Sequence, residues 1–155
     1  MRKVLIKEAT LDDSKDLWRW RNDEATRAMS ISTHSVAWDS HSSWFEKSLL
    51  NPNRFLYVGW LEADQTKVGM CRYDVDVDKK VAEVSINLNP ALRGLGLSSA
   101  LLSDSMKAFF AERSVDLVAT IKKENLASIK CFVKSGFELD SEDEVYQYYV
   151  FRLER

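Results

Sequence analysis

Cysteine, proline and glycine are all scarce in this chain of 155 residues, and each scarcity argues against a class of protein. The two cysteines, Cys71 and Cys131, lie in apolar-patterned segments with no second Cys or His at a metal-ligand spacing. This argues against a disulfide framework and against a metal site. The two prolines and five glycines form no repeat or linker, so we expect residues 1–155 to fold as one domain.

The chain also lacks a long apolar run and an excess of one charge. Its formal net charge is -2, with both signs spread along the sequence, so no basic field is present to attract nucleic acid or a membrane surface. No stretch approaches the roughly 20 apolar residues that a membrane span needs. The opening MRKVLIKEAT has too short an apolar run for a signal peptide, and we therefore expect a cytoplasmic protein.

Strand-like and helix-like patterns alternate along the chain. The three strand-like runs in the middle are joined by short polar turns, which predicts an antiparallel meander. A helix then separates the third run from a buried strand, which predicts a parallel pair. We find no clear pattern between residues 23 and 38. The expected strands cover 4–9, 54–62, 67–77, 79–88, 115–121 and 144–154, and the expected helices follow Thr10, cover 39–50, end near 112 and run from Asn125 to Gly136.

The last strand, EVYQYYVFRLE, carries most of the tyrosines of the chain. Its pattern fits an internal strand of the sheet and fits equally well an edge strand that pairs across a homodimer.

Two of the five glycines lie two residues apart in RGLGLSS, directly before a helix-like run. Unpaired N–H groups and the positive dipole end at a helix N-terminus can bind a phosphate when small residues let the backbone approach. A plain tight turn is the alternative. The P-loop ending is absent, and a dinucleotide fingerprint would need a third glycine at Ser99. The candidate phosphate-binding residues are Arg93, Gly94, Leu95, Gly96, Leu97, Ser98 and Ser99.

The same stretch resembles the acyl-CoA pyrophosphate loop of the GNAT acetyltransferase superfamily, whose pattern is Gln/Arg-x-x-Gly-x-Gly/Ala. Arg93 and Gly96 match that pattern, and Ser98 stands where the family has Gly or Ala. The later segment NLASIKCFVKSGFEL is similar to the family's helix that an Asn opens beside the cofactor, and the order of elements is also the GNAT order. The resemblance implies an α/β GNAT fold: a mixed, mostly antiparallel sheet of about seven strands with a splayed parallel central pair, about four helices, and acetyl-CoA as acyl donor.

The strand VAEVSINL alternates, so that Glu83, Ser85 and Asn87 share one face, and a polar face on a central strand must border water or a site. The resemblance implies that backbone near Asn87 and Leu88 holds the pantetheine arm. It also implies that Glu83, with Ser85 beside it in the catalytic group, takes the proton from the acceptor ammonium. We expect Glu83 to be a buried carboxylate with a raised pKa, and a purely structural carboxylate is the alternative.

In the family, a tyrosine seven residues after the helix-opening Asn protonates the departing thiolate. Here Asn125 opens the helix and that position is Phe132, which cannot donate a proton. The resemblance places Asn125, Ser128 and Phe132 against the cofactor, and leaves Tyr146, Tyr148, Ser128 or water to supply the proton. Without the tyrosine, a non-catalytic acyl-CoA-binding module is the rival interpretation.

Trp-Arg-Asn-Asp at 20–23 and His-x-x-Trp-Phe at 41–45 resemble two GNAT branches, the amino-sugar-nucleotide N-acetyltransferases of pseudaminic-acid type and the ribosomal-protein N-terminal acetyltransferases. We favour the first, which implies a small-molecule amine acceptor rather than a peptide. Arg19, Arg21 and Arg27 are then expected to meet a diphosphate, and His41 and Trp44 to contact the acceptor. The alternatives are a solvated helix face for the arginines and core positions for the rings.

Overall fold

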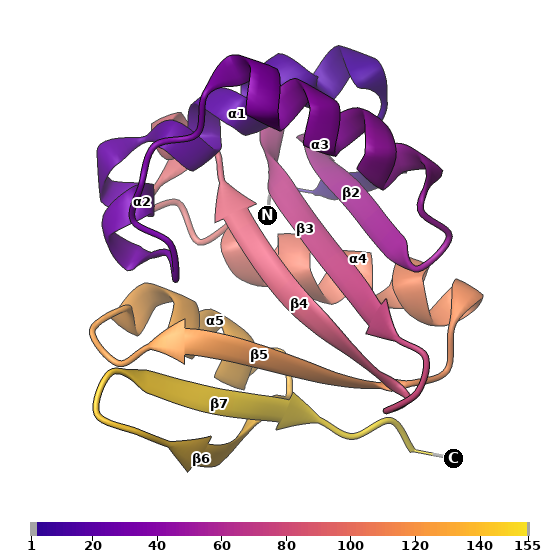
Figure 1. Ribbon diagram of the computed structural model, residues 1–155, viewed down its shortest axis with the longest axis vertical. Helices are drawn as coiled ribbons and strands as arrows, with labels where there is room; N and C mark the ends of the chain where they lie inside the picture. Colours follow the sequence, from indigo (N-terminus) through magenta and orange to yellow (C-terminus); the bar gives the residue numbers. More distant parts are fainter. Residues whose placement is uncertain (1–2, 155) are drawn as a thin grey trace.

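A single seven-stranded sheet forms the centre of the computed structural model, which describes residues 3–154. The strand order is β1-β2-β3-β4-β5-β7-β6, and only the β4–β5 pair is parallel. Figure 1 shows the strands in this arrangement. The strands are β1 (Val4–Glu8), β2 (Arg54–Leu61), β3 (Lys67–Asp76), β4 (Val81–Leu88), β5 (Asp116–Lys122), β6 (Glu138–Glu142) and β7 (Tyr146–Phe151).

The expected meander of β2, β3 and β4 is confirmed, and two glycines let a helix approach it closely. Gly59 and Gly69 are direct partners across β2 and β3. A Cβ atom at Gly59 would lie 2.6 Å from a side-chain carbon of Leu101, and a Cβ at Gly69 would lie 2.9 Å from another. Glycine at this pair therefore makes room for the Leu101 side chain against the sheet.

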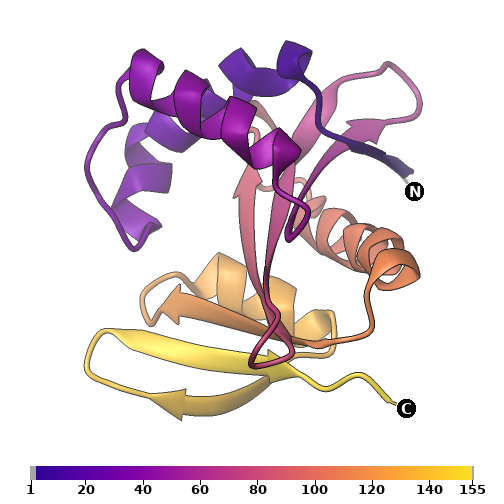
Figure 2. The same cartoon turned by 45° about the vertical axis from the view of Figure 1, so that its right-hand side comes forward.

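The parallel pair is also confirmed, and it is short. Strand β4 pairs with β5 only at Val81, Ala82 and Glu83, and its remaining residues have no partner on β5. Figure 1 shows the two strands meeting at one end and diverging toward their arrowheads, and Figure 2 shows β5, β6 and β7 turned across the direction of β2 to β4. The second half of β4 thus leaves backbone groups facing a gap in the sheet rather than a neighbouring strand.

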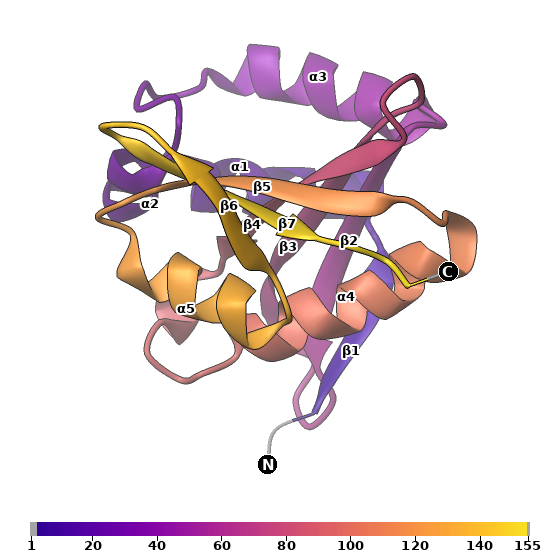
Figure 3. The same cartoon turned by 90° about the horizontal axis from the view of Figure 1, so that it is seen from below.

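Five α-helices cover the two faces of the sheet. In Figure 3, α3 lies on one side of the sheet and α4 and α5 lie on the other. One apolar core contains Leu17, Trp20, Phe45 and Met70, and the larger one lies under α4 and α5. The α-helices are α1 (Ser14–Asn22), α2 (Glu24–Met29), α3 (Trp38–Leu50), α4 (Ser98–Glu112) and α5 (Leu126–Lys134), and the two short 3-10 helices are η1 (Leu11–Asp13) and η2 (Pro90–Leu92).

Three features differ from the expectations drawn from the sequence. Helix α2 falls in the stretch that showed no pattern, because a six-residue helix with no buried residue has no apolar stripe. Strand β6 is exposed along its whole length, and a polar edge strand such as ELDSE lacks the alternation that marks a strand. Strand β7 is hydrogen-bonded to β5 on one side and to β6 on the other, so the interpretation of it as an unpaired edge that completes a homodimer is wrong.

Across residues 3–154, no helix combines the length and the apolar character that crossing a bilayer would require.

Candidate active site

A cavity of about 1060 Å³ opens where β4 and β5 separate. Its walls come from α1 and α2, from β3, β4 and β5, from the loop before α4, and from α5. On the sheet, the lining residues include Ser85, Asn87 and Leu88 of β4 and Thr120 and Ile121 of β5. The cavity therefore enters the gap between the two splayed strands.

The glycine loop forms one end of this cavity. Gly94 and Gly96 have φ angles of 76° and 72°, in the left-handed region that favours glycine. A Cβ atom added at either position would meet nothing within 4 Å, so the backbone borders open space. No side chain caps the N-terminus of α4, and its first turn holds no acidic residue. The loop thus presents free N–H groups and a dipole end that fit a pyrophosphate.

Arg93, at the start of this loop, is tied to the second helix. Its guanidinium donates to the carboxylate of Asp23 and, at 2.9 Å, to the hydroxyl of Thr26. The hydrogen bond from Arg93 holds the pKa of Asp23 below its usual value, and the backbone N–H of Thr26 lowers it further. The glycine loop and the α1–α2 segment are therefore linked through one cation.

Helix α5, which packs against α4, supplies another part of the wall with the residues expected beside the cofactor. Asn125 caps the helix by accepting from the N–H of Ser128 at 3.3 Å, and both residues line the cavity. Phe132 also lines it, but is 2% exposed and packs against Phe137 with ring centroids 4.9 Å apart. Burial raises the pKa of the neighbouring Cys131, which keeps that residue a thiol rather than a nucleophile.

The polar face of β4 is divided between the cavity and solvent. Ser85 and Asn87 line the cavity, whereas Glu83 is exposed and is not among the lining residues. The expectation of a buried Glu83 is thus wrong, because β4 still pairs with β5 at this position and the polar face there looks outward from the sheet. Glu83 instead lies directly across from Asp74 of β3.

Helices α1 and α3 also contribute lining residues, namely Arg21, His41 and Trp44, but His41 is 3% exposed and already hydrogen-bonded. Its Nε2 lies 2.9 Å from the carbonyl oxygen of Ser14 and so must carry the proton that it donates. Burial lowers the pKa of His41, the bond to Ser14 raises it, and the nearby Arg21 lowers it again. His41 is therefore a neutral, hydrogen-bonded ring in the cavity wall.

Besides Glu83, further expected site residues lie outside the cavity lining: Leu95, Ser99, Arg19, Arg27, Tyr146 and Tyr148. The side chain of Arg27 contacts the preceding helix, because its Nε donates to the carbonyl oxygen of Asn22 at 3.1 Å. Tyr146 begins β7 opposite Lys122. These placements leave Ser128, one helical turn before Phe132, as the proposed proton donor whose side chain borders the cavity.

Sequence reasoning missed Arg72 of β3, which also lines the cavity. The alternation of β3 places Arg72 on the same face as Met70 and Asp74. An arginine within a strand of the predicted meander was the sequence feature that could have indicated a site on this face. Its guanidinium lies over the ring of Trp44, 5.3 Å from the centroid, and its Nε is 3.0 Å from a carboxylate oxygen of Asp74.

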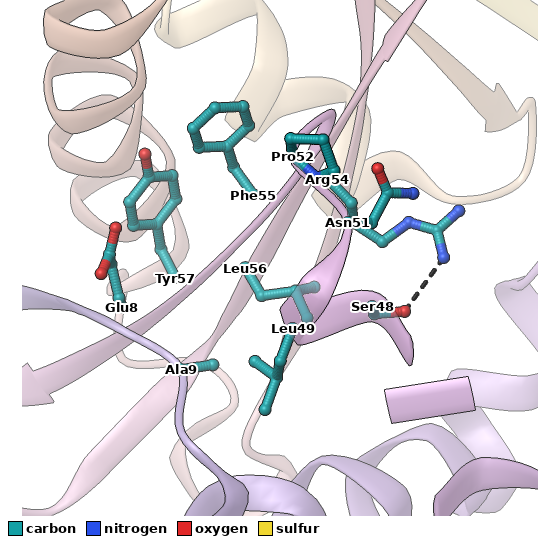
Figure 4. Close-up of a pocket in the computed structure, with 10 residues that line it drawn as sticks. All are labelled: Glu8, Ala9, Ser48, Leu49, Asn51, Pro52, Arg54, Phe55, Leu56 and Tyr57. Atoms are coloured by element: carbon teal, nitrogen blue, oxygen red, sulfur yellow. Dashed lines mark hydrogen bonds between the residues drawn. The ribbon is translucent and has the colours of Figure 1, made fainter. Parts of the chain in front are cut away.

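A second pocket, of about 220 Å³, shares no lining residue with the cavity. It lies between the end of α3 and the start of β2, and Figure 4 shows its side chains. Arg54 there donates to the hydroxyl of Ser48 at 3.0 Å and to Asp74 at 2.6 Å. Both bonds join the Arg54 guanidinium to other residues of the fold. None of the expected site residues lines this pocket.

A splayed parallel pair, an uncapped helix and a glycine loop together border one cavity whose shape and free N–H groups suit a phosphate-bearing ligand. Residues 3–138 match the family model described as the Acetyltransferase (GNAT) domain. The chain therefore belongs to the GNAT acetyltransferase family and is an acetyl-CoA-dependent acetyltransferase. A search of curated proteins finds no match.

Solved structures share the fold at low sequence identity. The spermidine N-acetyltransferase from Vibrio cholerae in complex with CoA and spermine is 12% identical with a TM-score of 0.85, over 96% of this chain and 95% of that chain. An acetyltransferase of the GNAT family from Bacillus anthracis is 17% identical with a TM-score of 0.82, over 98% of both chains. An aminoglycoside acetyltransferase in complex with coenzyme A is 18% identical with a TM-score of 0.81, over 97% and 95%.

Proposed function

We propose that this protein transfers an acetyl group from acetyl-CoA directly to a primary amine, and that the acceptor is an amino-sugar nucleotide. The observation that carries the transfer is the cavity at the splayed strands, which joins the glycine loop to the segments α1 to α3. Acceptors in the neighbouring structures are also amines, since the Vibrio enzyme acts on spermidine. Two free, buried cysteines fit a reducing cytoplasm as its place of action.

In this proposal, the backbone of Arg93 to Ser99 holds the pyrophosphate of acetyl-CoA and the unpaired backbone near Asn87 and Leu88 holds the pantetheine arm. Asn125 supports the same arm from α5. The fit rests on the positive φ angles of Gly94 and Gly96, the open space beside them, and the free first turn of α4.

Glu83 acts as the base. It removes a proton from the acceptor ammonium, the amine nitrogen forms a bond to the acetyl carbon, and the carbon–sulfur bond breaks. The sulfur then takes a proton from the Ser128 hydroxyl or from water, since Phe132 has none to donate, and the second proton that the nitrogen loses as the amide forms restores that hydroxyl or water. Glu83 adjoins the cavity through Ser85, which follows it on the same face of β4 and lines the cavity.

Replacement of the base tests this role. Glu83→Gln is expected to lower turnover chiefly below about pH 8, where the amine needs help to lose its proton, while acetyl-CoA affinity stays nearly intact. The measurement is thiol release against pH, with acetyl-CoA binding measured separately. Unchanged rates across the pH range would remove Glu83 from the mechanism.

The proposed function as a whole is tested by ligand binding and then by turnover. Acetyl-CoA and CoA are expected to raise the melting temperature by mass action, whereas NAD is not. Thiol release is then measured with amino-sugar nucleotides and with N-terminal peptides of ribosomal proteins. Preference for the peptides would replace the sugar acceptor by a protein N-terminus. Binding of acetyl-CoA without release by any amine would favour a non-catalytic acyl-CoA-binding module, which the buried Phe132 supports.

A further inference from the structure

The charged residues that line the large cavity are all basic. Arg21, Arg72, Arg93 and Lys130 line it, and within the described residues no Asp or Glu does. Arg93 and Lys130 belong to the loop before α4 and to α5, which are proposed to hold the pyrophosphate and the pantetheine arm of acetyl-CoA. Arg21 and Arg72 come from α1 and β3 instead. Two guanidinium groups therefore remain for the other substrate.

Arg72 is held in place but keeps donors free. Its guanidinium lies over Trp44 and beside Asp74, as described above, and Asp74 is shared with Arg54 at 2.6 Å. Among residues 3–154, Nε of Arg72 is buried without a hydrogen-bond partner, although it lies 3.0 Å from Asp74, and no hydrogen bond or ion pair is found at either terminal nitrogen. A planar guanidinium fixed by stacking, with both terminal nitrogens free, is suited to bidentate binding of a carboxylate or phosphate.

Arg21 adds a second, unneutralised cation. Within the part of the chain that the structure describes, Arg21 makes no ion pair and no hydrogen bond through its side chain. It lies close enough to Arg72 and to His41 to lower the pKa of each. Positive groups that repel one another across a cavity are stabilised when an anion binds between them.

The register of the sheet relates these cations to the proposed base. Arg72 is the direct partner of Ser85, and Asp74 is the direct partner of Glu83. Direct partners on antiparallel strands point to the same face. A ligand anchored on Arg72 therefore lies along the face that also carries Glu83.

We propose that the acceptor amine carries an anionic group, a carboxylate or a phosphate, and that Arg72 and Arg21 bind this group while the amine faces Glu83. The proposal rests on the acetyl-transfer function above and names the class of acceptor. A polyamine, which carries only positive charge, would find no counter-charge in the lining of the cavity.

Matched amines test the charge requirement in binding and in turnover. Glucosamine 6-phosphate is compared with glucosamine, and alanine with alaninamide, so that each pair differs in the anion; the two pairs separate phosphate from carboxylate. Spermidine serves as the cationic probe. Binding is measured by calorimetry on the protein saturated with CoA, and transfer by thiol release with acetyl-CoA. At least one anionic member is expected to bind and react roughly 10- to 100-fold better than its counterpart without the anionic group.

Variants assign the preference to the two arginines. Arg72→Met and Arg21→Met keep much of the side-chain volume and remove the charge, and each is expected to reduce the anionic preference by roughly tenfold or more. Arg19→Met is the matched control on α1, because Arg19 is exposed and lies 4.0 Å from Asp16 outside the cavity lining. Melting temperatures identify a variant that does not fold, in which case the other arginine variant carries the assignment.

Binding and turnover separate the two proposals. Selective binding of an anionic amine without thiol release would contradict acetyl transfer and uphold the anion site. Equal binding of the two members of each pair, tighter binding of spermidine, or a preference for the anionic member that survives in both arginine variants would overturn the anion site, even if transfer occurs.

Discussion

At the scale of single residues, two buried tyrosines on neighbouring strands differ in one hydrogen bond. The hydroxyl of Tyr57 has no partner within residues 3–154, and burial, with Glu8 and Glu112 nearby, raises its pKa to about 12. The hydroxyl of Tyr73 lies 2.7 Å from that of Ser105. Tyr57 borders the smaller pocket beside Glu8 (Figure 4).

Removal of the Tyr57 hydroxyl and removal of the Tyr73 hydroxyl are expected to change the free energy of unfolding in opposite directions. Tyr57→Phe removes an unsatisfied polar atom and is expected to leave the free energy of unfolding unchanged or raise it by up to about 1 kcal/mol. Tyr73→Phe breaks a buried bond and leaves Ser105 with one partner fewer, at a cost of about 1 kcal/mol or more. Urea unfolding of both variants measures the difference. A larger loss for Tyr57→Phe than for Tyr73→Phe would show that water or a ligand satisfies Tyr57.

His41 is expected to couple stability to pH. Its pKa in the folded protein is lowered from 6.5, chiefly by burial, so the unfolded chain binds the proton more readily. Proton binding then favours unfolding, and the stability that His41 contributes is complete above pH 6.5 and is lost as the pH falls from 6.5 toward the folded-state pKa.

Urea unfolding between about pH 7.5 and about pH 5.5 measures this dependence. The free energy of unfolding of the wild type is expected to fall more steeply with decreasing pH than that of His41→Gln. His34→Gln, at an exposed position, is the control and is expected to keep the wild-type slope. Parallel slopes for wild type and His41→Gln would mean that His41 titrates alike in both states.

At the scale of elements, the N-terminus of α4 depends on the backbone before it. Gly96 has a φ of 72° and faces open space. Gly96→Val would place a branched side chain where the phosphate is proposed to approach, and would strain the left-handed backbone. We expect at least a tenfold loss of CoA affinity, since several backbone hydrogen bonds to one charged group are affected together.

Calorimetric titration of CoA measures this loss in variants whose folding is confirmed by circular dichroism. Ala91→Val adds the same branched side chain at an exposed position of η2 outside the cavity lining, and is expected to bind as the wild type does. Full CoA affinity in a folded Gly96→Val protein would refute the placement of the pyrophosphate at this loop.

At the scale of the whole molecule, we expect residues 1–155 to unfold as one cooperative unit. The two apolar cores lie on opposite faces of one continuous sheet and so share its strands. The five tryptophans lie in α1, α3 and β2, on the side of the smaller core: Trp18, Trp20, Trp38, Trp44 and Trp60.

Tryptophan fluorescence therefore reports on one layer, whereas far-ultraviolet circular dichroism reports on all helices and strands. The two signals are expected to give the same urea midpoint. An earlier fluorescence midpoint would show that the α1–α3 layer unfolds by itself, and would contradict a single cooperative domain.

Sequence patterns predicted those helices and strands that bury one apolar face in the core and expose the other face to water. The meander of β2 to β4, the parallel β4–β5 pair and the helices α4 and α5 follow from apolar periodicity, and the glycine loop follows from its two glycines. Strand β6 and helix α2 escaped because they bury little, and periodicity carries no signal where no face is buried. Of the candidate site, the local motif on the loop and α5 was visible, while Arg72 was not.

The sequence by itself thus determined the order of the elements that have a buried face, the polar face of β4 and a backbone at Gly94 and Gly96 that only glycine adopts readily, because these depend on neighbours in the chain. Tertiary structure alone decided that β4 parts from β5 after Glu83, that Arg93 meets Asp23, and that Arg72 and Arg21 share one cavity. Those contacts join residues many positions apart, and their geometry is set by the twist of the sheet and the packing of helices on it, which no local pattern encodes.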